Sequence, residues 1–527
     1  MAVPKRRGLL RGEGPWPWLT AGSVAVSLLM LGALLLLLAT RGLGHFWPAP
    51  VTLVELEDGS RFAGTAVKEA PLPGGEGDER LYRTANRDLE ESPWTWVEVA
   101  AIEAERHPDD LVVLECHRWG AFHGRLVALR GGGVGVEGQR EEGGEDALVE
   151  GEAAWQRLTA RLAELEILRD ELARLRDDTI LPLAARLADG GNATLADELA
   201  HAQARLRDLE AAMASGDVLL ESVDGKRLWQ PIESILRAQR PNAMSVPDKL
   251  VAWGQGVWRF LAEGPRAANS AGGVWPAIFG TVLMVLLMSV LVTPFGVLAA
   301  IYLNEVAHQG RMTRMVRIAV RNLAGVPSIV YGVFGLGVFV YGIGGSLDDW
   351  FFADTLPSPT FGTGGLLWAS LTLALLTLPV VIVATEEGLA RIPDHQREGA
   401  LALGATRLEM LTRVVLPMAM PAMLTGMILA VARAAGEVAP LMLVGVAKLA
   451  PQVPVDGDFP FLHLERKFMH LGYHIYDVAF HGSDVQSALP LVYATALLLV
   501  LVILGLNLTA IFMRHYLRTR HGRLPRH

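Results

Sequence analysis

The sequence predicts an α-helical integral membrane protein with six transmembrane helices and an additional soluble domain of mixed α+β structure. The chain has 527 residues, of which 51% are hydrophobic, and its mean hydropathy is positive at +0.31. Most of its 56 Asp and Glu residues fall between positions 55 and 263, whereas long apolar runs dominate from position 272 onward. This division is typical of a membrane protein that carries a soluble portion.

Six apolar stretches are long enough to cross a bilayer. The hydrocarbon core is about 30 Å thick and needs roughly 20 mainly apolar residues in a helix, which satisfies its own backbone polar groups. The first stretch could instead be a cleaved signal peptide, because Lys5, Arg6 and Arg7 precede it. Its length and the lack of a clear cleavage site favour a membrane anchor. The predicted spans are 19–40, 276–303, 323–343, 365–385, 418–446 and 488–513.

The positions of the arginines predict the orientation of these spans. Arginines gather before the first span, between spans two and three, between spans four and five, and after span six, whereas the loop 344–364 has no Lys or Arg. Cytoplasmic loops carry the excess of Lys and Arg, so both termini are expected in the cytoplasm. The predicted organisation is an N-terminus with the first span (1–44), an extracytoplasmic insertion (45–270), a five-helix core (271–513) and a basic cytoplasmic tail (514–527).

The insertion is predicted to contain both strands and helices. Apolar and polar residues alternate on either side of Asp58-Gly59, as in a β-hairpin. Between about 152 and 215, leucines recur at three- and four-residue steps around Gly190-Gly191, which predicts a helical hairpin. We interpret these leucines as a packing seam, with a docking surface for a partner as the alternative. The predicted strands are 52–57, 61–67, 94–99, 111–116 and 126–129.

The segment between spans four and five contains a recognisable motif. From Arg397 it runs REGALALGATRLEMLTRVVLPMAMPA. It resembles the EAA loop of ABC-importer permeases, in which Glu-Ala-Ala is followed by a glycine and later by a Leu-Pro pair. Gly399 departs from the strict pattern. The matching positions are Glu398, Gly399, Ala400, Gly404, Leu416 and Pro417. We call residues 386–417 the coupling loop.

The residue types of the coupling loop suit a compact, force-bearing element. Small residues let two short helices seat closely, Gly404 permits a sharp turn between them, and Pro417 can start the next helix without losing a needed donor. The resemblance implies that the loop docks into an ATPase subunit. Because the sequence has no GxxxxGK[ST] phosphate loop, that ATPase is expected to be a separate chain. The alternative is an interfacial amphipathic helix without a partner.

Three further stretches narrow the resemblance to the phosphate permeases of the PstA type, with the sister PstC type as the near alternative. They are AAIYLNEVA from Ala299, NLAGVPSIVYGVFGLGVF from Asn322 and VARAAGEVAPLMLVG from Val431. The resemblance covers about 276–514 and implies a type I, MetI-like permease fold. It also implies a PstB-like ATPase in two copies, a PstC-like sister permease and a PstS-like binding protein. The insertion is a departure, because ordinary members have a much shorter loop there.

Two charged residues in the fifth predicted span require an explanation. Charges in a membrane span are costly unless they are paired or face water. Arg433 and Glu437 are four residues apart, so an ion pair along the helix is one interpretation. The resemblance implies instead that Arg433 is the cation of the phosphate path and that Glu437 tunes it. Asn322, which precedes Gly325 and Pro327, could line the same path or could only belong to a helix break.

The sequence therefore predicts a permease that moves inorganic phosphate across the bacterial inner membrane. Another oxyanion, such as molybdate or sulfate, is an alternative substrate, and a membrane-anchored sensor or assembly protein is an alternative of a different class. We expect a permease of this kind to perform no covalent chemistry and to bind no cofactor. No metal site is expected, because Cys116 is the single cysteine and nothing in the sequence resembles a Cys/His zinc spacing. The net charge of −9 argues against a nucleic-acid partner, and membrane lipid is the expected surrounding.

Overall fold

The chain divides into two compact units. The computed structural model describes residues 16–72, 77–84, 94–117, 120–131, 148–188, 193–214, 216–266, 271–450, 453–457, 461–481 and 485–521. The membrane unit comprises Met1–His45, Ala277–Lys448 and Lys467–His527, and the α/β unit comprises Phe46–Pro276 and Leu449–Arg466. The predicted insertion of 45–270 therefore omitted a segment between spans five and six that belongs to the α/β unit.

The first sheet of the α/β unit is an antiparallel meander with one added edge strand. Its described strands are ordered β4-β3-β2-β1-β5, and the predicted hairpin around Asp58-Gly59 pairs Thr52 with Gly64. Inward-facing Val54, Tyr82 and Val97 form its core. The bounds are β1 Thr52–Leu56, β2 Arg61–Pro71, β3 Asp78–Arg83, β4 Trp94–Glu98 and β5 Ile102–Arg106.

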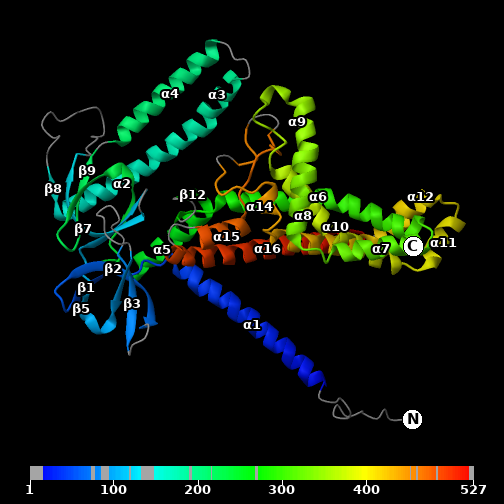
Figure 1. Ribbon diagram of the computed structural model, residues 1–527, viewed down its shortest axis with the longest axis horizontal. Coiled ribbons are helices and arrows are strands. Elements are labelled where there is room, and N and C mark those ends of the chain that lie inside the picture. The colour runs from blue at the N-terminus through cyan, green and yellow to red at the C-terminus, as the bar shows by residue number, and fades with distance from the viewer. Residues whose placement is uncertain are drawn as a thin grey trace. The chain divides into compact units, whose positions relative to one another are not determined.

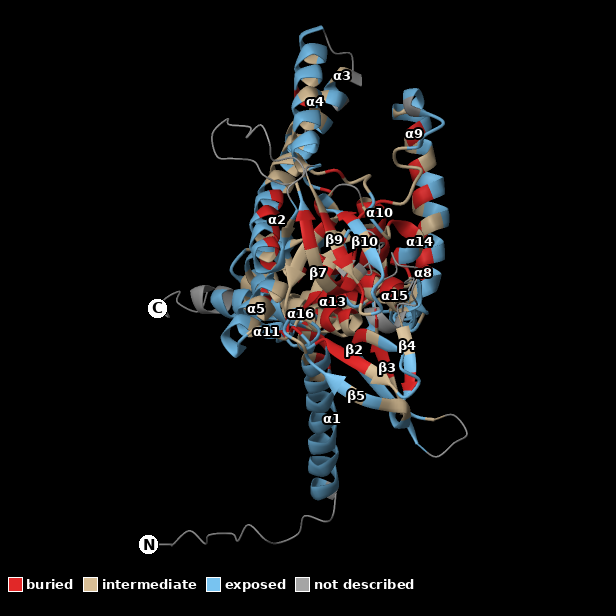
Figure 2. Cartoon of the chain, turned by 90° about the vertical axis from the view of Figure 1, so that its left-hand side faces the viewer, coloured by how far each residue is buried: buried red, intermediate tan, exposed pale blue. Residues whose placement is uncertain are grey.

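The second sheet carries the main core of this unit. The described strands are ordered β10-β9-β7-β6-β11, with β8 paired to β7. Leucines of helix α2 pack on one face of this sheet, and Leu158 and Leu165 are fully buried there. Figure 2 shows buried residues on β9 of this sheet, as well as in other parts of the chain. The bounds are β6 Leu111–Cys116, β7 Gly120–Arg130, β8 Val149–Glu150, β9 Asp217–Glu221, β10 Arg227–Pro231 and β11 Ile235–Gln239.

The predicted helical hairpin is present as a long arm (Figure 1). Helix α2 continues through a π-helical segment into α3, and α4 returns beside them. The seam leucines of the three helices are buried or half-buried within the unit, which supports the packing interpretation. The Gly190-Gly191 turn lies outside the described residues. The bounds are α2 Gly151–Arg174, the π-helical segment Leu175–Ile180, α3 Leu181–Ala188 and α4 Ala193–Met213; α5 (Val246–Ala262), β12 (Pro265–Arg266) and β13 (Ala271–Gly272) follow.

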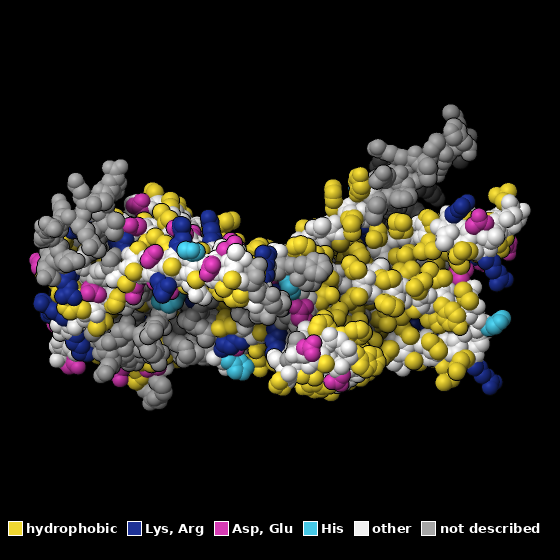
Figure 3. All heavy atoms as spheres, turned by 90° about the horizontal axis from the view of Figure 1, so that it is seen from above, with side chains coloured by type: hydrophobic (Ala, Val, Ile, Leu, Met, Phe, Trp, Pro, Cys, Tyr) yellow, Lys and Arg dark blue, Asp and Glu magenta, His cyan; other side chains and the backbone are white. Residues whose placement is uncertain are grey.

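The membrane unit contains the expected spans. Within the described residues, six helical stretches are long and apolar enough to cross a membrane. Hydrophobic side chains cover much of its visible face, as Figure 3 shows. The basic residues at positions 5–11, which were predicted to lie in the cytoplasm, are outside the described part of the chain. The stretches are Pro17–Gly44, Trp275–Val306, Ser328–Phe351, Leu366–Ala390, Arg407–Ala435 and Leu489–Tyr516.

These stretches are built from the following elements. Three π-helical segments, Tyr302–Val306, Gly335–Gly344 and Leu411–Val415, lie within or at the end of described spans. Figure 1 shows α7, α11, α12 and the C-terminus gathered at one end of the unit, which we call the arginine-rich end. The helices are α1 Trp16–Gly44, α6 Trp275–Ile301, α7 Arg311–Leu323, α8 Ser328–Phe334, α9 Gly345–Phe351, α10 Leu366–Ala390, α11 Asp394–Ala402, α12 Arg407–Met410, α13 Leu416–Ala435, α14 Leu441–Val444, α15 Leu471–His481 and α16 Val485–His521.

Two predicted spans have the wrong ends. Span three begins at Ser328 rather than at position 323, because Pro327 adopts an extended ψ of 136° and caps α8 from outside. Span five ends at Ala435, where Gly436 caps the helix, instead of continuing to position 446. The segment 324–327 therefore joins α7 to α8, and Glu437 follows α13 rather than lying inside it.

Glycines allow close packing at two positions in the third span. A Cβ at Gly332 would lie 2.7 Å from the Cα of Pro440, and one at Gly335 would collide with Thr372 of α10. Nothing lies within 4 Å of the same point at Gly337. Close approach of backbones through small residues is a common way to hold membrane helices together.

Candidate functional site

The coupling loop folds as two short helices joined by a tight turn. Helix α11 ends at Ala402, and Gly404 then takes a φ of +87°, which residues with a Cβ rarely adopt. Thr406 caps α12: its Oγ1 accepts from the backbone N–H of Glu409, and its own N–H donates to the Glu409 carboxylate. The predicted glycine turn between two helices is therefore present.

The second half of the coupling loop is continuous with span five. Helix α12 passes through the π-helical segment Leu411–Val415 into α13, which begins at Leu416. The sequence suggested that Pro417 starts a new helix. It does occupy the first turn of α13, but α13 is continuous with the helical segment before it. The π-helical segment lies directly before Pro417, which has no backbone N–H to donate to the preceding turn. Helix α12, the π-helical segment and α13 thus form one continuous helical rod.

A buried arginine fastens the other half of the loop. Arg397 of α11 donates to the carboxylate of Glu305 at 2.9 Å and to the backbone carbonyls of Leu389 and Ile392 at 2.8 and 2.6 Å. The Arg397 and Glu305 side chains are only 16% and 10% exposed. A charge-assisted pair this well shielded from water holds α11 against the ends of α6 and α10. Arg397 opens the motif of the coupling loop and Glu305 lies in the stretch that begins at Ala299, but their pairing was not predicted.

A second ion pair joins the same region. Arg317 of α7 donates through Nε to Glu386 of α10 at 2.8 Å, and the Glu386 side chain is 9% exposed. Beneath the two pairs lies an apolar cluster drawn from α6, α10, the coupling loop and α13. Its buried members are Ala300, Leu303, Ile382, Leu389, Ile392, Met410, Val415 and Ala419. The loop is therefore packed as part of the membrane unit's core.

The tip of the loop, in contrast, presents apolar side chains to the outside. Leu403 is 91% exposed and Leu408 is 70% exposed, on either side of the Gly404 turn. Glu398 and Gly399 are exposed on α11, and Ala400 is half-buried. An exposed apolar tip on a firmly held base is the arrangement expected of a surface that docks into a partner.

The charged residues of span five lie at the end of α13 remote from the coupling loop. The 20 residues of α13 span about 30 Å, and Arg433 is in the last turn. Its Nε lies 3.7 Å from Glu437 Oε1, with the side chains 34% and 22% exposed. Among the described residues, the buried Nε of Arg433 has no hydrogen-bond partner. This is a loose ion pair whose guanidinium keeps capacity for an oxyanion.

Asn322 does not lie in span three. It belongs to the last turn of α7, at the arginine-rich end, and its side chain is exposed. It lies just before the break between α7 and α8, which was one of its two interpretations. Among the described residues, no group of three or more His, Cys, Asp or Glu side chains is placed to hold a metal ion.

Comparison with known proteins gives a consistent result. A family model described as "Binding-protein-dependent transport system inner membrane component" matches residues 292–521. The chain is 34% identical over 271 residues to "Phosphate transport system permease protein PstA 1" of Mycobacterium tuberculosis, covering 51% of this chain and 78% of the relative. It is 32% identical over 258 residues to "Phosphate transport system permease protein PstA" of Yersinia pestis, covering 49% and 77%.

A solved structure of the MetNI methionine ABC transporter in an inward-facing conformation overlaps 52% of this chain and 99% of the compared chain, with 17% identity and a TM-score of 0.32. The sequence relatives carry the assignment, because the chain covers more than three-quarters of the length of each one named above. With its six spans and its coupling loop, the chain belongs to the PstA-type permeases of the binding-protein-dependent transport family.

Proposed function

We propose that this chain is a membrane-spanning subunit of an ATP-driven importer for inorganic phosphate. The coupling loop carries the proposal, because Arg397 and an apolar core fix its base while Leu403 and Leu408 leave its tip exposed. A rigid lever with an apolar tip is suited to receive a displacement from a separate nucleotide-hydrolysing chain. The continuous rod from α12 into α13 would pass that displacement to the spans.

The proposed partners follow from the same relationship. Permeases of this family work with an ATPase and a binding protein, and we propose a PstB-like ATPase in two copies, a PstC-like sister permease and a PstS-like binding protein. The chain itself would hydrolyse no ATP and bind no cofactor. We propose that both termini and the coupling loop face the cytoplasm, because the arginines lie at that end of the spans. The α/β unit would then lie outside the inner membrane.

Phosphate is supported by the named relatives and by the free capacity of Arg433. A guanidinium offers several N–H donors to a tetrahedral oxyanion, and the loosely placed Glu437 would keep the binding weak enough for release. The position in the last turn of α13 also has a simpler explanation, since a cation at a helix C-terminus is favourable by itself. Replacing Arg433 should slow phosphate transport if its guanidinium contacts the anion, and should leave transport unchanged if it only stabilises the end of α13.

Phosphate uptake by cells that carry the chain with its partners tests the substrate proposal. We expect Arg433→Gln to reduce the initial rate of uptake of radiolabelled phosphate at least about tenfold, equivalent to about 1.4 kcal/mol. Arg433→Lys keeps the charge and should retain more activity, while an excess of molybdate or sulfate should not compete. Uptake unchanged in Arg433→Gln would remove the anion role, and competition by molybdate or sulfate would reassign the substrate.

Crosslinking tests the lever. The native Cys116 is buried, so a cysteine introduced by Leu403→Cys should be the reactive one in the assembled complex. We expect a crosslink from position 403 to an ATPase chain, and none from the unsubstituted protein. Failure of position 403 to reach a nucleotide-binding chain, in a complex that still transports phosphate, would contradict the proposed docking.

A further inference from the structure

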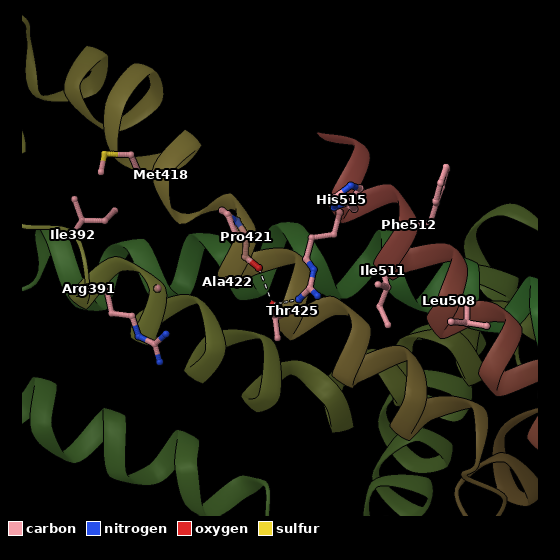
Figure 4. Close-up of a pocket in the computed structure, with 12 residues that line it drawn as sticks. Arg391, Ile392, Met418, Pro421, Ala422, Thr425, Leu508, Ile511, Phe512 and His515 are labelled. Atoms are coloured by element: carbon pink, nitrogen blue, oxygen red, sulfur yellow. Dashed lines mark hydrogen bonds between the residues drawn. The ribbon is translucent and has the colours of Figure 1, made fainter. Parts of the chain in front are cut away.

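A groove at the arginine-rich end of the membrane unit is not used by the proposed transport mechanism. It has a volume of about 930 Å³ and lies among the end of α10, the first half of α13 and the last turns of α16. Figure 4 shows that its labelled side chains come from separate segments of the chain, with Pro421, Ala422 and Thr425 facing the α16 residues Leu508 and Ile511 across the groove. All three helices belong to predicted membrane spans.

The walls of the groove are apolar and open to the surroundings. Leu508 and Phe512 of α16 are 64% and 72% exposed, and Met418 of α13 is 45% exposed. The base is closed by a tight contact between two spans, because a Cβ at Gly388 would collide with the Cβ of Ala422. In a protein of this family, such walls face acyl chains rather than water.

The rim of the groove is cationic. Arg514 donates through Nη1 to Thr425 Oγ1 at 3.0 Å, which holds its guanidinium beside α13. Arg391 is 82% exposed and reaches Glu387 only at 3.8 Å, so its charge is largely uncompensated. His515 adds a third basic side chain. Of the described residues that line the groove, none is acidic.

Apolar walls beneath a cationic rim fit one kind of ligand. We propose that this groove binds an anionic phospholipid from the leaflet on the side of the coupling loop, with its phosphate at Arg391 and Arg514 and its chains along α13 and α16. The depth supports this assignment: span four ends at Ala390, directly before Arg391, and span six ends at Tyr516, just after Arg514. Basic pockets between spans at this boundary are suited to lipid headgroups.

A free phosphate ion would use the same guanidinium chemistry but would gain nothing from the apolar walls. The lipid also has a mechanical consequence, because Arg391 and Ile392 line the groove and Asp394 begins α11. A bound lipid would therefore tie α16 to the segment from which the coupling loop starts. Its occupancy would stabilise the base of the lever without touching the proposed phosphate path at Arg433.

Lipid retention tests this proposal directly. The full complex is placed in nanodiscs of phosphatidylcholine and phosphatidylglycerol in equal amounts, and lipids that remain after extraction are counted by native mass spectrometry. We expect phosphatidylglycerol to be retained preferentially by the unsubstituted protein. Each arginine near an anionic lipid raises the affinity for that lipid about fivefold. The double variant Arg391→Ala/Arg514→Ala should therefore retain about 25-fold less phosphatidylglycerol. Arg514→Lys, which keeps the charge, should lose much less.

Arg407→Ala is the matched control, because Arg407 is exposed at the same end of the spans but does not line the groove. It should retain phosphatidylglycerol normally. Equal retention of both lipids by the unsubstituted protein would overturn the proposal without reference to any variant. Undiminished retention in the double variant would overturn it as well, and so would displacement of the lipid by added inorganic phosphate or a crosslink that shows a protein chain filling the groove.

Discussion

Arg397 holds a position from which a single side chain fixes the base of the coupling loop. Its guanidinium donates hydrogen bonds to the backbone carbonyls of Leu389 and Ile392, at the end of α10, and to the carboxylate of Glu305. Removing one partner of a shielded pair leaves the other charge buried and alone, at a cost of about 3 kcal/mol or more. We expect Arg397→Ala to lower the unfolding temperature of the membrane unit and to reduce phosphate uptake, measured in the same preparation.

The control for Arg397→Ala is Arg413→Ala in the same loop. Arg413 is 79% exposed and lies 3.9 Å from Glu409, so this pair should contribute less than about 1 kcal/mol. Its loss should leave the unfolding temperature nearly unchanged. Equal destabilisation by the two substitutions would show that the buried pair with Glu305 is not what fastens α11.

Two buried histidines, His470 just before α15 and His474 within it, predict a loss of stability at low pH. Burial lowers the pKa of His470 and that of His474 from 6.5 to about 4, so both are neutral in the folded protein at pH 7. The unfolded chain binds these protons near pH 6.5, before the folded chain does. Their contribution is therefore complete above pH 6.5 and is lost as the pH falls toward 4.

Thermal unfolding of the purified complex between pH 7.5 and pH 5 measures this effect. Each histidine accounts for at most about 2 kcal/mol of the change over this pH range. His470→Gln removes one titrating group, so it should flatten the fall in unfolding temperature between these two pH values. A variant whose unfolding temperature falls as steeply as that of the unsubstituted protein would contradict the assignment to His470.

At the scale of single elements, the turn between α11 and α12 depends on the backbone of one glycine. A Cβ at Gly404 would meet nothing within 4 Å, so the penalty of a substitution is conformational and follows from its φ of +87°. We expect Gly404→Ala to cost about 1–2 kcal/mol and to weaken ATPase coupling. Gly399→Ala is the matched control, because Gly399 is helical and equally unobstructed.

The two glycine substitutions should have opposite signs. Alanine in a helix interior is more favourable than glycine by about 0.5–1 kcal/mol, so Gly399→Ala should slightly raise the unfolding temperature. Differential scanning of the two variants, together with the ATPase activity of the assembled complex, measures both effects. A stabilised Gly404→Ala would mean that the turn does not need a left-handed residue.

Local patterns predicted most of the elements but few of their connections. Alternation gave β6 at its observed bounds, and apolar length gave all six spans within the described residues. Helix ends were missed where a cap decides them, as at Pro327 and Gly436. The partnership of Arg397 with Glu305 was missed because 92 residues separate them, and no periodicity reports a contact of that range.

Within the candidate site, the parts that depend on one continuous segment were predicted, and the parts that depend on helix ends were not. The coupling loop is one continuous segment, so its small residues and its glycine turn could be found in the sequence. Arg433 and Glu437 were identified as charges in an apolar run, but their position at the end of α13 depends on where that helix stops. The place of Asn322 at the end of α7 was not predicted, because it depends on α7 stopping at Leu323 before Pro327 caps α8.

At the scale of the whole molecule, each unit has a core made from its own residues. Leu165 is fully buried between α2 and the second sheet, whereas Ile167 on the same helix is 69% exposed. We expect Leu165→Ala to cost about 2–5 kcal/mol and Ile167→Ala much less. Limited proteolysis during heating should show cleavage of the α/β unit at lower temperature in Leu165→Ala, with cleavage of the membrane unit unchanged. Equal loss of both units would show that they unfold together.

The contribution of Leu449–Arg466 to the α/β unit has a consequence for biosynthesis. A ribosome releases Phe46–Pro276 after only one span has been made, yet the remaining segment of that unit appears after four more. The early part must stay soluble and unaggregated while those spans are being inserted, and it is completed only late in translation. Premature termination anywhere between positions 277 and 448 would therefore leave an unfinished α/β unit tethered to the membrane, a product that quality-control proteases can recognise.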